Sequence, residues 1–133
     1  MLERFLILAI VLIASVLILE RLTRIKTGQK INSNLFRSHG IRLNNSHPSV
    51  LYFWSDYCAP CRSQSLILKN LKQEFHNINF IHLNAVNEKK VASSLNIKTV
   101  PAIAVITSDK EVKFLNQGFT REEILKKELE EVY

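Results

Sequence analysis

The chain has 133 residues, which is enough for one domain and little else. Apolar residues make up 47% of it and charged residues 23%, the balance of a globular chain. The net charge of +6 belongs to the N-terminal part, because residues 50–133 carry eleven basic and ten acidic side chains. This distribution argues against a nucleic-acid-binding face on the folded part, and we expect no nucleic-acid partner.

The first feature in chain order is an apolar segment over residues 5–19 that contains no charge. Its length lies between a signal-peptide core and the ~20 residues that cross a bilayer. A buried core helix would normally show a polar face, and this segment has none. No A-x-A-like cleavage site follows Leu19. We therefore predict an uncleaved single-pass transmembrane anchor over residues 1–22, with a removed signal peptide as the alternative.

Residues 23–48 are predicted to form a basic polar linker. Between Arg21 and Arg42 the sequence has six basic residues and no acidic one. Such a stretch either rests on anionic lipid headgroups or is a solvated linker with a charge bias. It ends in N-N-S-H-P-S, a cluster of turn-forming residues.

From residue 49 onward, short apolar runs alternate with amphipathic segments. A stripe of Leu66, Ile67, Leu71 and Phe75 predicts the first helix, and Thr120 followed by Glu123 predicts a capping box before the last one. The order β-α-β-α-β-β-α implies an α/β fold with a central sheet. The expected strands are Val50–Trp54, Ile78–Leu83, Ala102–Thr107 and Glu111–Leu115, and the expected helices are 62–75, 88–95 and 120–132.

The only two cysteines lie in F-W-S-D-Y-C-A-P-C-R, after the first strand and at the start of the first helix. Unpaired N–H groups at a helix N-terminus stabilise a thiolate at Cys58. The spacing brings the sulfur of Cys61 within bonding reach, and Pro60 is tolerated in a first helical turn. This pattern predicts an attacking thiol, a resolving thiol and a rigid turn between them.

Two other uses of a cysteine pair fit less well. A structural disulfide closing a two-residue loop would constrain little of the unfolded chain. A zinc site needs four ligands, and no histidine lies at a spacing typical of such sites. We therefore expect redox chemistry at the pair, no metal and no separate cofactor; an inert remnant is the remaining alternative. The histidines concerned are His39, His47, His76 and His82.

Three motifs together resemble the thioredoxin family: V-L-Y-F-W-S-D-Y-C-A-P-C-R, T-V-P-A at residues 99–102 and G-F-T at residues 118–120. The resemblance covers residues 49–133. It implies a pared-down thioredoxin-like fold, a mixed sheet flanked by helices, in which Pro101 is a cis-proline facing the cysteines. It also implies that the backbone of Val100 pairs with an extended substrate segment. An ordinary trans proline at a strand start is the alternative for Pro101.

The sequence departs from the family pattern at several positions. Tyr57 stands where the family usually has Trp, and it is an aromatic residue able to cover the site. The family's buried acid falls on Tyr52 and its partner lysine on His82, so the acid usually assigned to deprotonating the resolving thiol is missing. His82 is either a base near neutral pH or an ordinary strand residue. Arg62 either lowers the Cys58 pKa or is simply solvated.

The predicted function is thiol–disulfide exchange, in which Cys58 attacks a substrate disulfide and Cys61 resolves the mixed disulfide. Strong oxidants of this family carry a histidine between the cysteines, whereas Ala59 and Pro60 add no charge, so a reductase is favoured. Two alternatives stay open. One is a disulfide oxidase or isomerase of the same fold, and the other is a non-catalytic binding module.

The expected partners are protein thiols or disulfides, an upstream electron donor and the lipid bilayer through residues 5–19, with the protein a monomer. The positive-inside rule favours a cytoplasmic domain, because the basic residues follow the apolar segment. Membrane-tethered members of the family in bacteria commonly face the extracytoplasmic side, where they reduce secreted substrates. We predict the extracytoplasmic side.

Overall fold

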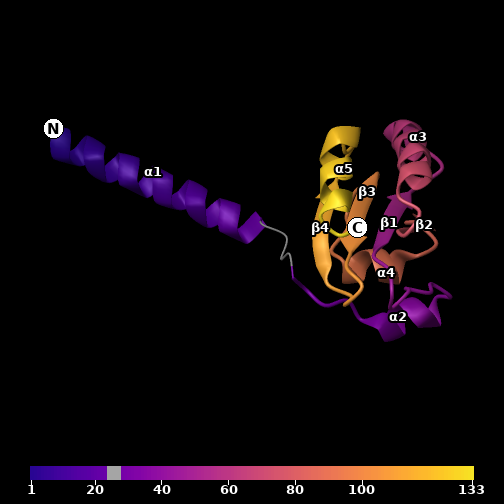
Figure 1. The fold of residues 1–133 in the computed structure, drawn as a ribbon. Helices are drawn as coiled ribbons and strands as arrows, with labels where there is room; N and C mark the ends of the chain where they lie inside the picture. The colour runs from indigo at the N-terminus through magenta and orange to yellow at the C-terminus, as the bar shows by residue number, and fades with distance from the viewer. Residues whose placement is uncertain (24–27) are drawn as a thin grey trace.

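The computed structural model describes residues 1–23 and 28–133, and of residues 20–23 it describes the backbone alone. Figure 1 shows a long N-terminal helix followed by a sheet with helices on both faces. The predicted order β-α-β-α-β-β-α is confirmed from residue 49 onward. The elements are α1 (Leu2–Thr23), α2 (Ser33–Ser38), β1 (Ser49–Trp54), α3 (Ala59–Glu74), β2 (Asn79–Asn84), α4 (Lys89–Ser94), β3 (Ala102–Ile106), β4 (Val112–Gln117) and α5 (Glu122–Glu130).

Helix α1 is the only described helix that is long and apolar enough to cross a membrane. Its window Leu2–Leu19 has a mean hydropathy of 2.6, and none of it is buried against the rest of the chain. A membrane anchor and a secretion signal share these properties.

The sheet has the strand order β2-β1-β3-β4, with β1 and β2 parallel and the other pairs antiparallel. The central strand β1 is paired on both sides and buried on both faces, which explains its continuous apolar run. Its side chains alternate between two cores. Leu51 and Phe53 pack with the cluster that includes α2 and α4 residues, whereas Val50 and Tyr52 pack with α3 and α5. The fold is therefore a mixed four-stranded sheet between two helical layers.

Residues 28–41 belong to the packed domain. This corrects the predictions that residues 23–48 form a polar linker and that the domain begins at residue 49. Ile31, Phe36 and Ile41 are buried in the same core cluster as Leu51. The backbone pairs as well: Lys30 forms a β-bridge with Glu111, next to β4. The sequence pattern did not show this because the three buried residues, spaced five apart, match neither a helical nor a strand period.

Two local predictions on the helices are also corrected. The buried stripe of α3 includes Gln64 and Leu68, while Leu66 is 65% exposed. Thr120 does not cap α5; Arg121 is the N-cap residue and makes no side-chain cap bond. Thr120 is buried and its Oγ1 accepts a hydrogen bond from Asn116 Nδ2 at 2.8 Å, so tertiary contacts have taken the hydroxyl that a capping box would use.

Truncation of Phe36 tests whether residues 28–41 belong to the core. We expect Phe36→Ala to lower the free energy of unfolding by about 3–5 kcal/mol, because its ring is fully buried. Leu66→Ala is the control and should change it by less than about 0.5 kcal/mol. Denaturant unfolding followed by tryptophan fluorescence of Trp54 measures both. Equal stability of the two variants would show that residues 28–41 contribute no core.

Candidate redox site

The first strand positions the reactive pair. β1 ends at Trp54, and the chain turns through three residues to Cys58, the N-cap residue of α3. Cys58 has extended backbone angles (φ −107°, ψ 102°), and its side chain makes no capping hydrogen bond. Pro60 is the second residue of the helix, where a missing N–H breaks no intrahelical bond. The sulfur of Cys58 therefore lies at the positive end of a 16-residue helix.

Cys58 and Cys61 form a disulfide with their Cα atoms 5.3 Å apart. Their surroundings differ: Cys58 is half-buried, whereas Cys61 is 4% exposed. Cys58 is therefore the more accessible of the two residues. This asymmetry is what the roles of attacking and resolving thiol require.

The pair opens into a surface cavity of about 510 Å³. Asp56 and Arg62 bring one charge of each sign to it, and Leu66, exposed on α3, lines it too. The walls come from the end of β1, the start of α3 and β2. The lining residues are Tyr52, Trp54, Ser55, Asp56, Cys58, Cys61, Arg62, Ser65, Leu66 and His82.

The start of β3 lies at the same edge of the sheet. Ala102 pairs with Phe53, so the residue before it, Pro101, lies beside the end of β1 from which the chain leads to Cys58. The Val100–Pro101 peptide bond is cis. Pro101 is buried and Val100 is half-buried. The topology thus brings Val100 and Pro101, more than forty residues along the chain, to the end of the sheet that carries the cysteines.

The Thioredoxin family model matches residues 29–131, most of the chain. The chain belongs to the thioredoxin family. The match begins 20 residues before the block that the sequence motifs outlined, in agreement with the buried residues of the 28–41 segment.

Individual relatives are distant. A thioredoxin of Borreliella burgdorferi is 27% identical over 77 residues, which cover 57% of this chain and 65% of that protein. The TPR repeat-containing thioredoxin TDX of Arabidopsis thaliana is 35% identical over 63 residues, 47% of this chain and 17% of that one. The oxidised form of mitochondrial thioredoxin 3 from Saccharomyces cerevisiae has a similar fold, with a TM-score of 0.62 at 19% identity, covering 79% of this chain and 94% of that one. The matched part thus spans less than two thirds of these two curated relatives.

Tyr52 fills the position at which thioredoxins bury an acid. Its hydroxyl donates a 2.7 Å hydrogen bond to the backbone carbonyl of Cys61, and the side chain is 2% exposed. Burial raises the pKa of Tyr52 to about 12, so the phenol stays protonated at neutral pH. The hydroxyl therefore supports the first turn of α3 as a neutral donor and cannot accept a proton from Cys61 as a carboxylate would.

His82 stands on β2 opposite Tyr52. The two rings meet edge to face with centroids 5.2 Å apart. Partial burial, and then the positive charge of Lys72, lower the pKa of His82 below its usual value. A lowered pKa keeps the imidazole neutral at pH 7, the state in which one ring nitrogen accepts a proton.

Three other predicted site residues are exposed. Tyr57 is fully exposed and does not line the cavity, so it does not cover the disulfide in this structure; Trp54 lines the cavity instead. Arg62 is exposed on the first turn of α3 and lines the cavity. Pro60 is exposed between the cysteines.

Sequence reasoning missed Gln117, the last residue of β4, which holds the segment before the cis-proline. Its Oε1 accepts hydrogen bonds from the backbone N–H groups of Lys98 (2.7 Å) and Thr99 (3.3 Å). Its Nε2 donates to the carbonyl of Asn96 at 3.0 Å. The neighbouring N–H of Gly118 donates to the carbonyl of Pro101 at 2.7 Å. In the sequence, the only signal that these segments meet is the pair of family motifs beside them, T-V-P-A at residues 99–102 and G-F-T at residues 118–120.

Sequence reasoning also missed Gln64, because its partner lies 56 residues along the chain. It is fully buried, and its amide bonds both backbone groups of Thr120: Nε2 donates to the carbonyl at 3.1 Å, and Oε1 accepts from the N–H at 2.7 Å. This pair ties the turn of α3 that follows Cys61 to the chain entering α5. A buried glutamine is stable in an apolar core when both ends of its amide are paired, as they are here.

Removal of the Gln117 side chain should free the segment before the cis-proline. We expect Gln117→Ala to speed amide hydrogen exchange at Lys98 and Thr99 by about 5-fold, since a hydrogen bond contributes about 1 kcal/mol. Lys113→Ala, on the same strand but exposed, is the control and should leave both amides unchanged. Exchange followed by NMR measures the effect. Unchanged rates in Gln117→Ala would contradict this role.

Proposed function

We propose that this chain is a thiol–disulfide oxidoreductase that acts through Cys58 and Cys61. The observation that carries the proposal is the bonded pair itself, with an accessible sulfur at a helix N-terminus and a buried one a turn further in. Membership of the thioredoxin family supports the same chemistry. The active form would be the reduced dithiol.

In the proposed reaction, the thiolate of Cys58 attacks one sulfur of a substrate disulfide. A Cys58–substrate disulfide forms and the first substrate thiolate leaves. Cys61 then loses its proton and attacks the sulfur of Cys58, which releases the second substrate thiolate and forms the Cys58–Cys61 disulfide. Two electrons pass from the dithiol to the substrate, and a donor must return them.

We infer that an extended substrate segment pairs with the backbone of Val100 beside Pro101. Strand addition binds through backbone groups and so tolerates many sequences near the reactive sulfur. The half-buried position of Val100 and the fixation of the preceding segment by Gln117 support this assignment. Tyr57, fully exposed next to Cys58, is free to turn onto a bound substrate.

Because Tyr52 takes the place of the family's acid on β1, the proton of Cys61 needs another acceptor. We assign this role to His82, because it lines the same cavity as Cys61 and its lowered pKa keeps it neutral. Arg62 contributes positive charge near the Cys58 thiolate, and Pro60 keeps the turn between the sulfurs rigid. These three are auxiliary groups, and the two cysteines alone make and break bonds.

Serine variants test the assignment of the two cysteines. We expect Cys58→Ser to lose all reduction of a protein disulfide such as that of insulin with dithiothreitol as donor. Cys61→Ser should instead accumulate a covalent complex with the substrate, because no thiol remains to resolve it. Non-reducing gel electrophoresis with mass spectrometry detects the complex. No reduction by the unaltered chain above the rate of dithiothreitol alone would favour the non-catalytic binding module, in which the thioredoxin fold only holds a partner.

For the direction of electron flow, we propose a reductase. Ala59 and Pro60 add no charge or hydrogen-bond donor that would stabilise the Cys58 thiolate beyond the helix terminus. We expect the reduction potential of the pair in the full chain to be about −270 mV, the thioredoxin value. Equilibration with glutathione or dithiothreitol mixtures and mass analysis of the alkylated chain measures it. A value of about −120 mV would mark a disulfide oxidase instead.

We further propose that α1 anchors the chain in a membrane and that the redox domain lies on the extracytoplasmic side. There the protein would act as a monomer on secreted thiols, and it would bind no nucleic acid. The uncharged stretch of α1 supports the anchor, and a cleaved signal is the alternative. In sealed right-side-out vesicles, Ser46→Cys in a Cys58→Ser/Cys61→Ser background should react with a membrane-impermeant maleimide. Labelling only in inside-out vesicles would show that the domain is cytoplasmic. An intact mass lower by about 20 residues would show that the N-terminal segment is a cleaved signal peptide.

A further inference from the structure

A second cavity, of about 610 Å³, lies away from the redox site. It is walled by α2, by the segment that follows α2, and by the turn between β3 and β4. Its lining contains three cations and no carboxylate. The lining residues are Ser33, Asn34, Arg37, Gly40, Ile41, Arg42, Leu43, Asn45 and Lys110.

The cavity and the redox site occupy opposite ends of the sheet. Cys58 follows the C-terminal end of β1, whereas Ser49 at the other end pairs with Ile106, just before the turn that carries Lys110. A ligand in this cavity would therefore not occupy the substrate path to the disulfide.

Backbone and side-chain contacts fix the walls. The N–H of Ile31 donates to the carbonyl of Lys110 at 3.0 Å, which joins the chain entering α2 to the turn. Asn32 caps α2 through Oδ1, which accepts from the N–H groups of Asn34 and Leu35, and Phe36 anchors the helix in the core. The cations thus project from structured elements rather than from a loose linker.

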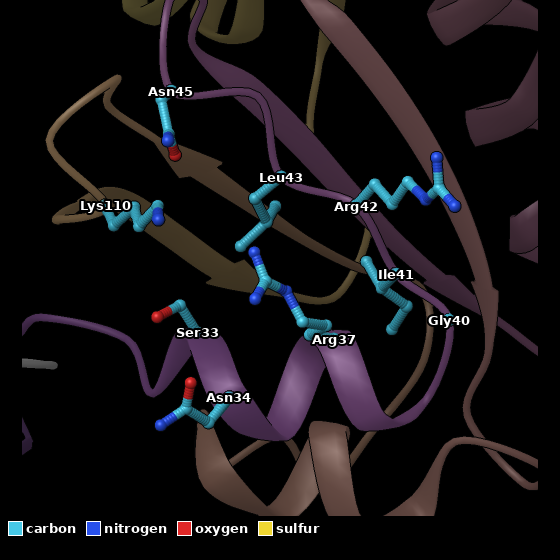
Figure 2. A pocket seen from close by; sticks show the side chains of 9 residues that line it. All are labelled: Ser33, Asn34, Arg37, Gly40, Ile41, Arg42, Leu43, Asn45 and Lys110. Atoms are coloured by element: carbon cyan, nitrogen blue, oxygen red, sulfur yellow. The ribbon is translucent and has the colours of Figure 1, made fainter.

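Figure 2 shows how the side chains lie in this cavity. Arg37 and Lys110 reach toward the space in front of Leu43, and the amide of Asn45 points toward the same space, whereas Arg42 extends away from it. The ion pairs of the described residues are Lys30–Glu111, Lys113–Glu131 and Lys126–Glu74. Within that part of the chain neither Arg37 nor Lys110 has a carboxylate partner.

Lys110 also has an unusual backbone. Its φ is +64°, in the left-handed region that glycine adopts freely and that costs other residues about 1 kcal/mol. The turn therefore holds a lysine where glycine would fit better. A residue kept in an unfavourable conformation points to a use for its side chain.

We propose that this cavity binds a phosphate group, carried either by a soluble phosphate ester or by an anionic lipid headgroup. A guanidinium pairs with two phosphate oxygens at once, an ammonium adds a point charge, and hydroxyl and amide donors complete the shell. Arg37, Lys110 and Asn45 supply these three kinds of group. The apolar side chains of Ile41 and Leu43 fit the carbon skeleton attached to the phosphate.

Both a lipid headgroup and a soluble phosphate ester could reach this cavity. Ser33 follows the end of α1 at Thr23 by ten residues, which span at most about 35 Å when extended. A headgroup is therefore accessible if α1 lies in a bilayer, as proposed above. A soluble ester needs no membrane, so the existence of the site does not depend on that proposal.

The first test is a calorimetric titration of the full chain, in an uncharged detergent, with glycerol 3-phosphate. We expect saturable binding that weakens as salt is added. Lys110→Gly removes the cation and suits the positive φ, so it should weaken binding at least 10-fold without lowering the unfolding temperature. Arg37→Gln/Lys110→Gly should abolish binding. Lys89→Gln/Lys90→Gln, an equal charge change at two exposed positions of α4, should alter the dissociation constant less than twofold.

The second test distinguishes the sources by hydrogen exchange of the full chain in nanodiscs. Protection of residues 33–45 and 110 in phosphatidylglycerol-containing discs, absent in phosphatidylcholine discs and in Arg37→Gln/Lys110→Gly, would identify a lipid headgroup. Binding of glycerol 3-phosphate without that protection would identify a soluble ester. The proposal is overturned if neither signal appears, or if the α4 control loses binding as strongly as the Arg37 and Lys110 variants. None of these readouts involves Cys58 or Cys61, so they stand apart from any test of the redox function.

Discussion

The site depends on the pairing of β1 in the centre of the sheet. This strand is hydrogen-bonded to β2 on one side and to β3 on the other, and its side chains are buried on both faces. Its C-terminal end is therefore fixed in position, and the short turn after Trp54 delivers Cys58 to the start of α3. Because β3 runs antiparallel to β1, the same pairing brings Pro101 to that end of the sheet. One set of backbone bonds thus places both halves of the site.

Two amide side chains complete this arrangement. Gln64 joins the first turns of α3 to the chain entering α5, and Gln117 holds the segment that leads to Val100 and Pro101. Both bond backbone groups rather than other side chains. A backbone partner exists at every position whatever its side chain, so such links fix chain paths without demanding a particular residue at the other end.

The disulfide lacks the neighbouring buried acid of the family pattern. Tyr52 replaces the buried acid and bonds the Cys61 carbonyl, and the neighbouring His82 has its pKa lowered by burial and by Lys72. In the proposed reaction, Cys61 transfers its proton to this neutral imidazole instead of to a carboxylate. At the opposite end of the sheet, the cations Arg37 and Lys110 gather without acidic partners among the described residues. The disulfide and this cluster of cations thus lie at opposite ends of the sheet.

The sequence by itself determined the order of strands and helices from residue 49, the cysteine pair at a helix start and the apolar helix before it. These features follow from the spacing of apolar and polar residues that are neighbours in the sequence. Tertiary structure alone decided that Ile31, Phe36 and Ile41 belong to the core, that Gln64 is buried while Leu66 lines a cavity, and that Thr120 bonds Asn116 instead of capping α5. Each of these depends on a partner far along the chain, and a single sequence does not record which distant residues meet.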